Sequence, residues 1–282
     1  MKGSLRGMVC AAAVVLIGAC LVPVAGAQQQ DEQVVPFSDP SRPGKVEVGL
    51  LNSGGITVRG ENRRDVAVVI RSASGRPAPA ERPAPPGMKR LTQTPGYSIS
   101  EERNEIKIES NSFRGGIGAL EIRVPLRTNL ELSSVNGGTI TVENVEGELE
   151  IENVNGAVVL TNVAGSVVAN SQNGGVTATL SRVTADKPMS FSSFNGKVDV
   201  TMPASIKATL KMRSDNGDIF TDFDVQLQQA PPATPAAAGR GNRNGRPFRL
   251  EVNRAIYGSV NGGGPEIELR SFNGTIYLRK GQ

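Results

Sequence analysis

Apolar and polar residues alternate along most of the chain in short runs, and glycine separates these runs. From residue 130 onwards the glycines Gly137, Gly147, Gly156, Gly165 and Gly174 recur at spacings of 10, 9, 9 and 9 residues. Each unit has room for a strand of about five residues and a turn of about four. The pattern therefore predicts a repeat of short β-strands.

Within each unit one set of alternate positions is apolar and the other is polar. Leu149 and Ile151, for example, alternate with Glu148, Glu150 and Glu152. The same alternation places Ile140 and Val142, and Val158 and Leu160, on one face. Because successive residues of a strand point to opposite sides, one face is expected to be core and the other to meet solvent.

Asparagine-glycine pairs mark the turns between the units. Both residues tolerate the positive φ angles of tight turns, so the turns are encoded locally. The pairs begin at Asn136, Asn155, Asn173, Asn195, Asn216, Asn261 and Asn273. Such pairs between apolar runs also favour hairpins, so an antiparallel β-meander is an alternative architecture.

Two successive units of about nine residues together make a longer repeat of about nineteen residues. This longer repeat instead favours a stack in which equivalent strands lie above one another. We therefore predict an all-β fold, a β-solenoid of the parallel β-helix type. In this fold Val145, Val154 and Val163 are expected to turn into the core. Asparagines at the corners are expected to stack and to exchange amide hydrogen bonds.

The first 27 residues have the features of a secretory signal peptide. Lys2 and Arg6 precede an apolar run from Val9 to Val24, and Ala25-Gly26-Ala27 resembles a cleavage site. A retained membrane anchor is disfavoured because the apolar run is short for a span. Lipid attachment at Cys20 is the other alternative, although the residues after it are apolar. We expect export to the periplasm or the cell surface, with no transmembrane segment after signal removal.

The remainder is expected to form one domain. Residues 28–43 are predicted to be a polar lead-in, and 44–282 a single solenoid-like domain. Two segments, 76–96 and 228–247, are too rich in proline and too polar to be strands. They are predicted to be surface insertions.

Composition excludes many kinds of chemistry. The chain has no histidine, and both cysteines, Cys10 and Cys20, lie in the predicted signal peptide. A mature chain would therefore lack imidazole bases, thiol nucleophiles and disulfides. Signal removal takes away Lys2 and Arg6, so 31 − 2 = 29 basic residues would face 27 acidic ones. So weak a positive charge argues against a nucleic-acid partner.

One stretch of sequence resembles a known family. It consists of Ile122-Arg123-Val124-Pro125, then Asn129-Leu130-Glu131-Leu132, then Val135-Asn136-Gly137-Gly138-Thr139-Ile140-Thr141-Val142 and its successors. This progression resembles the putative-adhesin, or toastrack-like, β-strand-repeat family of bacterial envelope proteins over roughly residues 45–279. The resemblance implies an exported β-solenoid-like domain for adhesion or envelope scaffolding, without catalytic residues to carry over.

Acidic residues are the first candidates for a site. Glu148, Glu150 and Glu152 share one strand face, near Glu131 and Glu143, and could hold calcium or act as paired carboxylates. Alternation alone also produces such a row, so a solvated strand face is the simpler interpretation. A second cluster comprises Asp218, Asp222 and Asp224.

Basic and aromatic residues are the other candidates. Arg240, Arg243, Arg246 and Arg249 lie in or just after the second insertion and could contact anionic groups, although a solubilising loop is the simpler interpretation. Six aromatic residues could form a sugar-stacking surface but are expected to be the core of the C-terminal coils. They are Phe191, Phe194, Phe220, Phe223, Phe272 and Tyr277.

The sequence as a whole predicts a non-catalytic interaction or scaffold protein of the cell envelope, without a metal or cofactor. Its expected partners are envelope proteins or cell-surface glycans. The alternative is a carbohydrate-active enzyme that uses Glu148, Glu150 or Asp218. A deep groove holding two carboxylates would favour the enzyme, and an even wall of Thr, Asn and Glu would favour binding.

Overall fold

The structure, a computed structural model, describes residues 32–70, 97–110, 118–184, 187–229 and 255–281. The predicted signal peptide (1–27) and the first predicted insertion (76–96) lie outside the described residues. So do most of the second insertion and the four arginines in and just after it. Within the described residues there is no helix that is long and apolar enough to cross a membrane.

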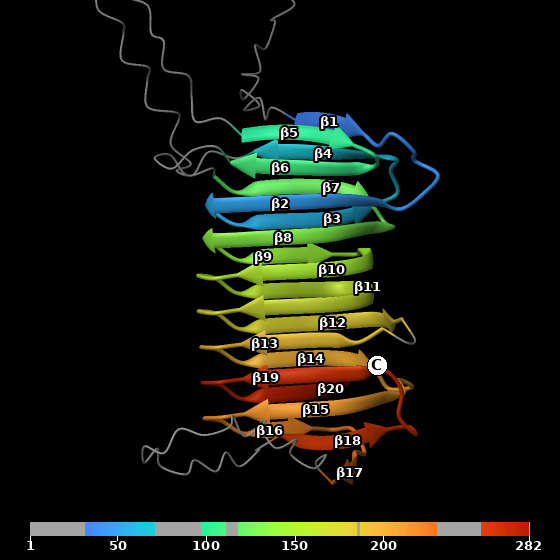
Figure 1. Ribbon diagram of the computed structural model, residues 1–282, viewed down its shortest axis with the longest axis vertical. Helices are drawn as coiled ribbons and strands as arrows, with labels where there is room; N and C mark the ends of the chain where they lie inside the picture. The colour runs from blue at the N-terminus through green and yellow to red at the C-terminus, as the bar shows by residue number, and fades with distance from the viewer. Residues whose placement is uncertain (1–31, 71–96, 111–117, 185–186, 230–254, 282) are drawn as a thin grey trace, which may run out of the picture.

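The described strands form one elongated stack of flattened coils with two walls (Figure 1). In stacking order the first wall contains β5 (Tyr97–Glu102), β6 (Glu105–Ser110), β2 (Gly44–Asn52), β8 (Thr128–Asn136), β10 (Glu146–Asn153), the second half of β11 (Val158–Ser171), β13 (Met189–Ser193), β19 (Glu266–Ser271), β15 (Ala208–Ser214), β18 (Ile256–Val260) and β17 (Gln226–Gln228).

The second wall runs beside it in the same direction of stacking. It contains β1 (Glu32–Pro36), β4 (Asp65–Ile70), β7 (Leu120–Pro125), β3 (Ile56–Glu61), β9 (Ile140–Glu143), the first half of β11, β12 (Val176–Val183), β14 (Val198–Pro203), β20 (Ile276–Gly281) and β16 (Ile219–Thr221).

The solenoid prediction is confirmed, because equivalent strands pair in parallel from one coil to the next. Leu149 of β10 lies opposite Leu130 of β8 on one side and opposite Val167 of β11 on the other. On the second wall Val158 is flanked by Ile140 and Val176 in the same way. The apolar residues of successive repeats thereby form continuous rows inside the stack.

Antiparallel pairing, the basis of the meander alternative, is confined to the two ends of the stack. At one end β5 pairs with β6, and β4 pairs with both β1 and β7. At the other end β18 pairs with β15 and β17. An open parallel coil would expose a long edge to pairing with other chains. The antiparallel strands cover that edge on both walls at the first end and on the first wall at the other end, where the second wall closes with the short parallel strand β16.

The order of the coils differs from the order of the sequence at both ends. The coil β2–β3 lies between β6–β7 and β8–β9, although it precedes both in the sequence. The last coil, β19–β20, lies between β13–β14 and β15–β16. Local periodicity does not reveal either insertion, because each coil carries the same apolar rows wherever it is placed.

The core lies between the walls and is built from the inward rows. Ile151, Ile140 and Val158 are all completely buried, and each buried aliphatic side chain stabilises the fold by about 1.5–3 kcal/mol. Val145 and Val163 are buried as predicted. The prediction for Val154 is wrong: it is half-buried, because Asn153 takes the inward position there.

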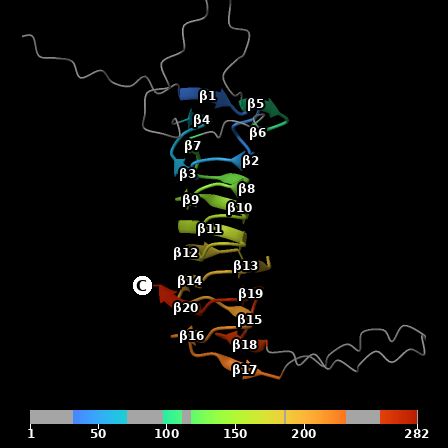
Figure 2. The same ribbon diagram turned by 90° about the vertical axis from the view of Figure 1, so that its left-hand side faces the viewer.

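Asparagines stack along one edge of the solenoid, as predicted. In the ladder, each side-chain amide group donates to the amide oxygen of the asparagine before it in stacking order, with N–O distances from 2.9 to 3.2 Å. In stacking order the ladder comprises Asn52, Asn136, Asn155, Asn173, Asn195, Asn273 and Asn216. This asparagine edge faces the viewer in Figure 2. Asn261 is not part of it and donates to the carbonyls of Ala204 and Ile206.

The glycines that follow these asparagines serve a different purpose from the one inferred from sequence. Neither they nor the ladder asparagines have positive φ. Instead, a Cβ atom on Gly196 would lie 2.5 Å from the carbonyl oxygen of Gly174 in the coil above. Glycine is therefore required because successive coils approach too closely for any side chain.

The segment expected to be a polar lead-in contributes to the fold. Its residues 32–36 form β1, which pairs with β4, and Phe37 is buried against the core. The apolar run Val34-Val35-Pro36-Phe37 is short and does not alternate, so it gave no periodic pattern from which this could be predicted.

Candidate functional site

The acidic row on β10 lies on the outer surface of the first wall. Glu148, Glu150 and Glu152 are exposed, and Glu131 of β8 lies beside Glu150 as expected. Glu143 does not join them, because β9 belongs to the second wall. There its carboxylate accepts a hydrogen bond from Arg59 Nε at 3.0 Å.

Lysines cross-link the acidic residues of this wall from strand to strand. Lys45 Nζ lies 2.7 Å from Glu131 and 3.2 Å from Glu105, and Lys107 Nζ lies 2.9 Å from Glu47. The hydrogen bond with Glu131 raises the pKa of Lys45, and that with Glu47 raises the pKa of Lys107. The bond from Lys45 lowers the pKa of Glu105. Exposed pairs of this kind each contribute little to stability.

A hollow of about 240 Å³ lies over this wall, lined in part by Lys45, Glu131, Glu148 and Glu150. An acid catalyst needs a carboxyl that retains its proton at neutral pH, which burial in an apolar pocket provides. Glu148 and Glu150 are exposed, and Glu148 is paired with Lys187. Glu131 and Glu148 are therefore paired with lysines, and Glu150 lies exposed between them on the surface of the wall.

The second acidic cluster is spread over the C-terminal end of the solenoid. Asp218, Asp222 and Asp224 are all exposed, and Asp222 accepts a hydrogen bond from the backbone amide of Lys280 at 2.7 Å. In the part of the chain that the structure describes, no group of three acidic residues could hold a metal ion.

The predicted aromatic core is confirmed only in part. Phe191 and Phe223 are buried, but Phe194, Phe220 and Phe272 are 51%, 52% and 38% exposed. The exposed rings stack in pairs on the outside of the coils. Phe194 packs on Phe272 with ring centroids 4.7 Å apart, and Phe220 packs on Tyr277 at 5.6 Å. Phe220 is exposed because it occupies an outward position in β16. Phe194 and Phe272 are exposed because they lie at corners of the stack, directly after β13 and β19.

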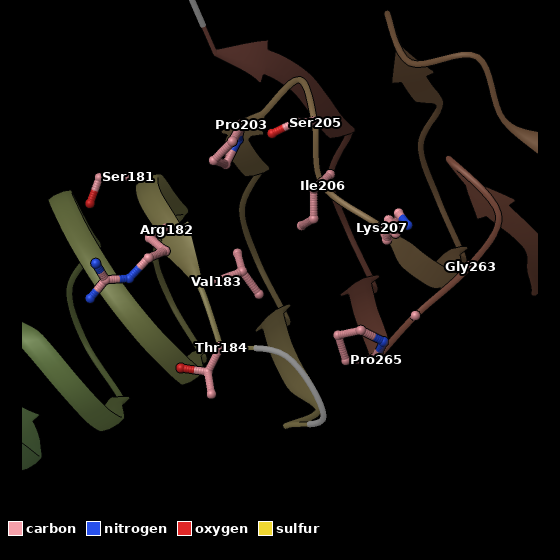
Figure 3. Close-up of a pocket in the computed structure, with 11 residues that line it drawn as sticks. Ser181, Arg182, Val183, Thr184, Pro203, Ser205, Ile206, Lys207, Gly263 and Pro265 are labelled. Atoms are coloured by element: carbon pink, nitrogen blue, oxygen red, sulfur yellow. The ribbon is translucent and has the colours of Figure 1, made fainter.

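Further hollows line the edge opposite the asparagine ladder. This opposite edge consists of the turns and strand ends at residues 37–43, 62–64, 126–127, 144–146, 183–184, 203–207 and 261–265, together with the irregular middle of β11 at residues 161–165. One hollow of about 460 Å³ lies between the end of β12 and the turns before β15 and β19, where Val183, Ile206 and Pro265 line it (Figure 3).

Two further hollows continue along the opposite edge. A hollow of about 400 Å³ shares Arg182 and Thr184 with the first, and one of about 130 Å³ shares Pro43 and Arg127 with the second. Sequence reasoning missed these sites because their residues come from turns far apart in the chain. The adjacent pair Arg63-Arg64, in a turn between apolar runs, was the one local indication.

Two solved structures resemble this chain. The crystal structure of a "putative cell adhesion protein" from Clostridium sporogenes has 12% sequence identity and a TM-score of 0.44, covering 90% of this chain and 100% of the other. That of a "putative adhesin" from Bacteroides fragilis has 10% identity and a TM-score of 0.27, covering 90% and 98%. At these similarities, activity and partners are not carried over.

No family model and no curated protein matches the sequence.

Proposed function

We propose that this chain is an exported, non-catalytic interaction protein of the cell envelope that binds glycans or other envelope components along its length. The main support is the first wall, where Lys45 bridges Glu131 and Glu105 across adjacent strands. Carboxylates that are paired and hydrated in this way are suited to hydrogen bonding with a ligand rather than to proton transfer.

The second wall supports the same function. Its outward positions form rows of threonine, in which Thr161, Thr179 and Thr201 lie in register on neighbouring strands. Hydroxyl groups at the regular spacing of about 4.8 Å between strands present a repeated pattern of donors and acceptors. A long polar surface of this kind suits contact with an extended polymer.

Retention on isolated cell-wall glycan tests this function. The immobilised mature chain, residues 28–282, should retain glycan fragments, and their size distribution should remain unchanged after prolonged incubation. A parallel column carrying heat-denatured protein provides the control for non-specific binding. Shortened fragments, with shortening abolished in Glu150→Gln, would replace this proposal with the carbohydrate-active enzyme. An absence of retention by any envelope fraction would refute the interaction role.

Export is tested by sequencing the N-terminus of the protein from its native host. The Ala25-Gly26-Ala27 site predicts a mature chain that begins at Gln28. A lipid-modified N-terminus at Cys20 would make the protein a lipoprotein, and an intact Met1 would contradict export.

A further inference from the structure

Four arginines converge on the smallest of the three hollows along the opposite edge. Arg42, Arg63, Arg64 and Arg127 line this arginine hollow, and its described lining contains no carboxylate. The four residues come from three turns: the one before β2, the one between β3 and β4, and the one between β7 and β8. The order of the coils therefore brings together guanidinium groups that are distant in sequence.

Two of the four positive charges have no counter-charge among the described residues. Arg42 Nε lies 2.7 Å from Asp39, and Arg63 Nε lies 2.7 Å from Asp65. Within the described ranges neither Arg64 nor Arg127 has an ion-pair partner. Two unpaired guanidinium groups in one hollow repel each other, and an anion between them would relieve the repulsion. The planar guanidinium fork matches the two oxygens of a carboxylate or phosphate.

The adjoining hollow of about 400 Å³ has a different character. It shares Arg127 with the arginine hollow and offers uncharged hydrogen-bonding side chains at Asn129, Ser166 and Thr184. Its other charges are balanced within it, because Arg182 pairs with Glu146, and Lys187 pairs with Glu148. Such a surface suits neutral hydroxyl groups better than a second anion.

The two hollows together indicate one kind of ligand. We infer that the opposite edge binds an acidic polysaccharide, with the acidic group of one sugar between Arg64 and Arg127 and its neighbouring sugar in the adjoining hollow. An anionic membrane is a poorer fit, because a lipid surface presents like charges and leaves the uncharged donors and acceptors of the adjoining hollow without a counterpart. This inference rests on the proposed function, for which it supplies a ligand class and a site.

The test measures binding of the mature protein to polygalacturonate oligomers at low salt by calorimetry. The variant Arg64→Gln/Arg127→Gln should bind at least about tenfold more weakly, because hydrogen bonds to charged groups are the strong ones. Arg64→Lys/Arg127→Lys should show an intermediate loss, since it retains charge without the fork. Arg270→Gln is the matched control: it removes one exposed arginine at the end of β19 nearest the asparagine edge, and affinity should stay within about twofold. Dextran, an uncharged polymer, should bind no better to the wild type than to the double variant.

Equal binding of oligomers by the wild type and the double glutamine variant would overturn the inference. A second result would also overturn it: the wild type binds vesicles of anionic lipid but not the oligomers, and the double variant no longer binds the vesicles. Arg64 and Arg127 are exposed, so unchanged melting temperatures are expected and will separate lost binding from lost folding. If the double variant binds the oligomers as the wild type does and is retained by cell-wall glycan, this inference fails and the proposed function stands. If the wild type binds the oligomers but is retained by no wall fraction, the proposed function fails and the arginine hollow still stands as a binding site for acidic sugars.

Discussion

Phe194 and Phe272 stack face to face with their ring planes 1° apart, although they belong to coils that are separated by another coil in the sequence. Phe194 follows β13 and Phe272 follows β19, the strand that inserts between β13 and β15. On the other wall Phe220 and Tyr277 stack between β16 and β20. Exposed aromatic pairs therefore lie on both sides of the inserted C-terminal coil.

The Phe194–Phe272 pair is expected to hold this coil in place. A double-mutant cycle with Phe194→Leu and Phe272→Leu should give a coupling free energy of about 0.5–1.5 kcal/mol in chemical unfolding. Phe194→Leu combined with Phe220→Leu is the control, and these changes should be additive because the two rings belong to different stacks. A coupling near zero for the first pair would show that the stack contributes no stability.

The inward and outward register of β10 can be tested at neighbouring positions. Ile151→Asp should destabilise the protein by more than about 4 kcal/mol, because it buries an unpaired carboxylate in a fully enclosed site. If that variant does not fold, Ile151→Val should still be measurable, with a loss of about 0.5–1.5 kcal/mol. Glu150→Gln, at an exposed position, should leave the unfolding midpoint unchanged. Greater sensitivity at Glu150 than at Ile151 would contradict the register.

Close stacking of coils predicts opposite effects at two glycines. Gly196→Ala should cost about 1–3 kcal/mol, because the new methyl group would overlap the backbone of Gly174. At Gly49 a Cβ atom would have no neighbour within 4 Å, so Gly49→Ala in strand β2 should be neutral or stabilising by up to about 1 kcal/mol. Thermal melting of both variants measures the difference. Similar melting temperatures would argue against close packing at the asparagine edge.

Asp199 is expected to contribute stability that depends on pH. Partial burial opposes its ionisation, but hydrogen bonds from Arg279 and Lys197 outweigh this and lower its pKa below the ordinary value of 3.8. Its contribution is therefore complete above that value and is lost as the pH falls through the lower pKa of the folded state. Asp199→Asn should lower the melting temperature at about pH 7 and have a smaller effect at about pH 2.

Asp224→Asn is the control for this experiment, because Asp224 is exposed and has no ion pair among the described residues. Its effect on the melting temperature should be small at both pH values. An effect of Asp199→Asn that grows towards low pH would contradict the assigned direction of the pKa shift.

The middle of the solenoid was predictable because its determinants are local. Leu149 and Ile151 alternate with glutamates, so the two-residue period of a strand decides which face is buried. The recurrence of Asn155 and Asn173 at the same phase then predicts their stacking and the hydrogen bond between them. Both features are confirmed because neighbouring repeats in sequence are also neighbours in space there.

The local sequence pattern did not predict the burial of residues whose surroundings depend on their position in the stack. Phe194 and Phe272 were assigned to the core by their apolar character, but their place at a corner exposes them. Val154 was expected to be buried in the same way as Val145. At that corner of the stack Asn153 takes the inward position instead and is buried. Glu143 lies next to the acidic row in the sequence but on the opposite wall, since each turn moves the chain across the core.

The sequence by itself determined the all-β class, the solenoid repeat, the inward rows and the asparagine ladder, because each follows from the period of strands and turns. Only the tertiary structure decided the order of the coils at the two ends and the antiparallel strands that cover them. It alone also placed Arg64 and Arg127 in one hollow. These relationships join residues far apart in the chain through backbone pairing between strands. Repeats of similar length and pattern can pair with one another equally well, so the pattern alone does not decide which coils become neighbours.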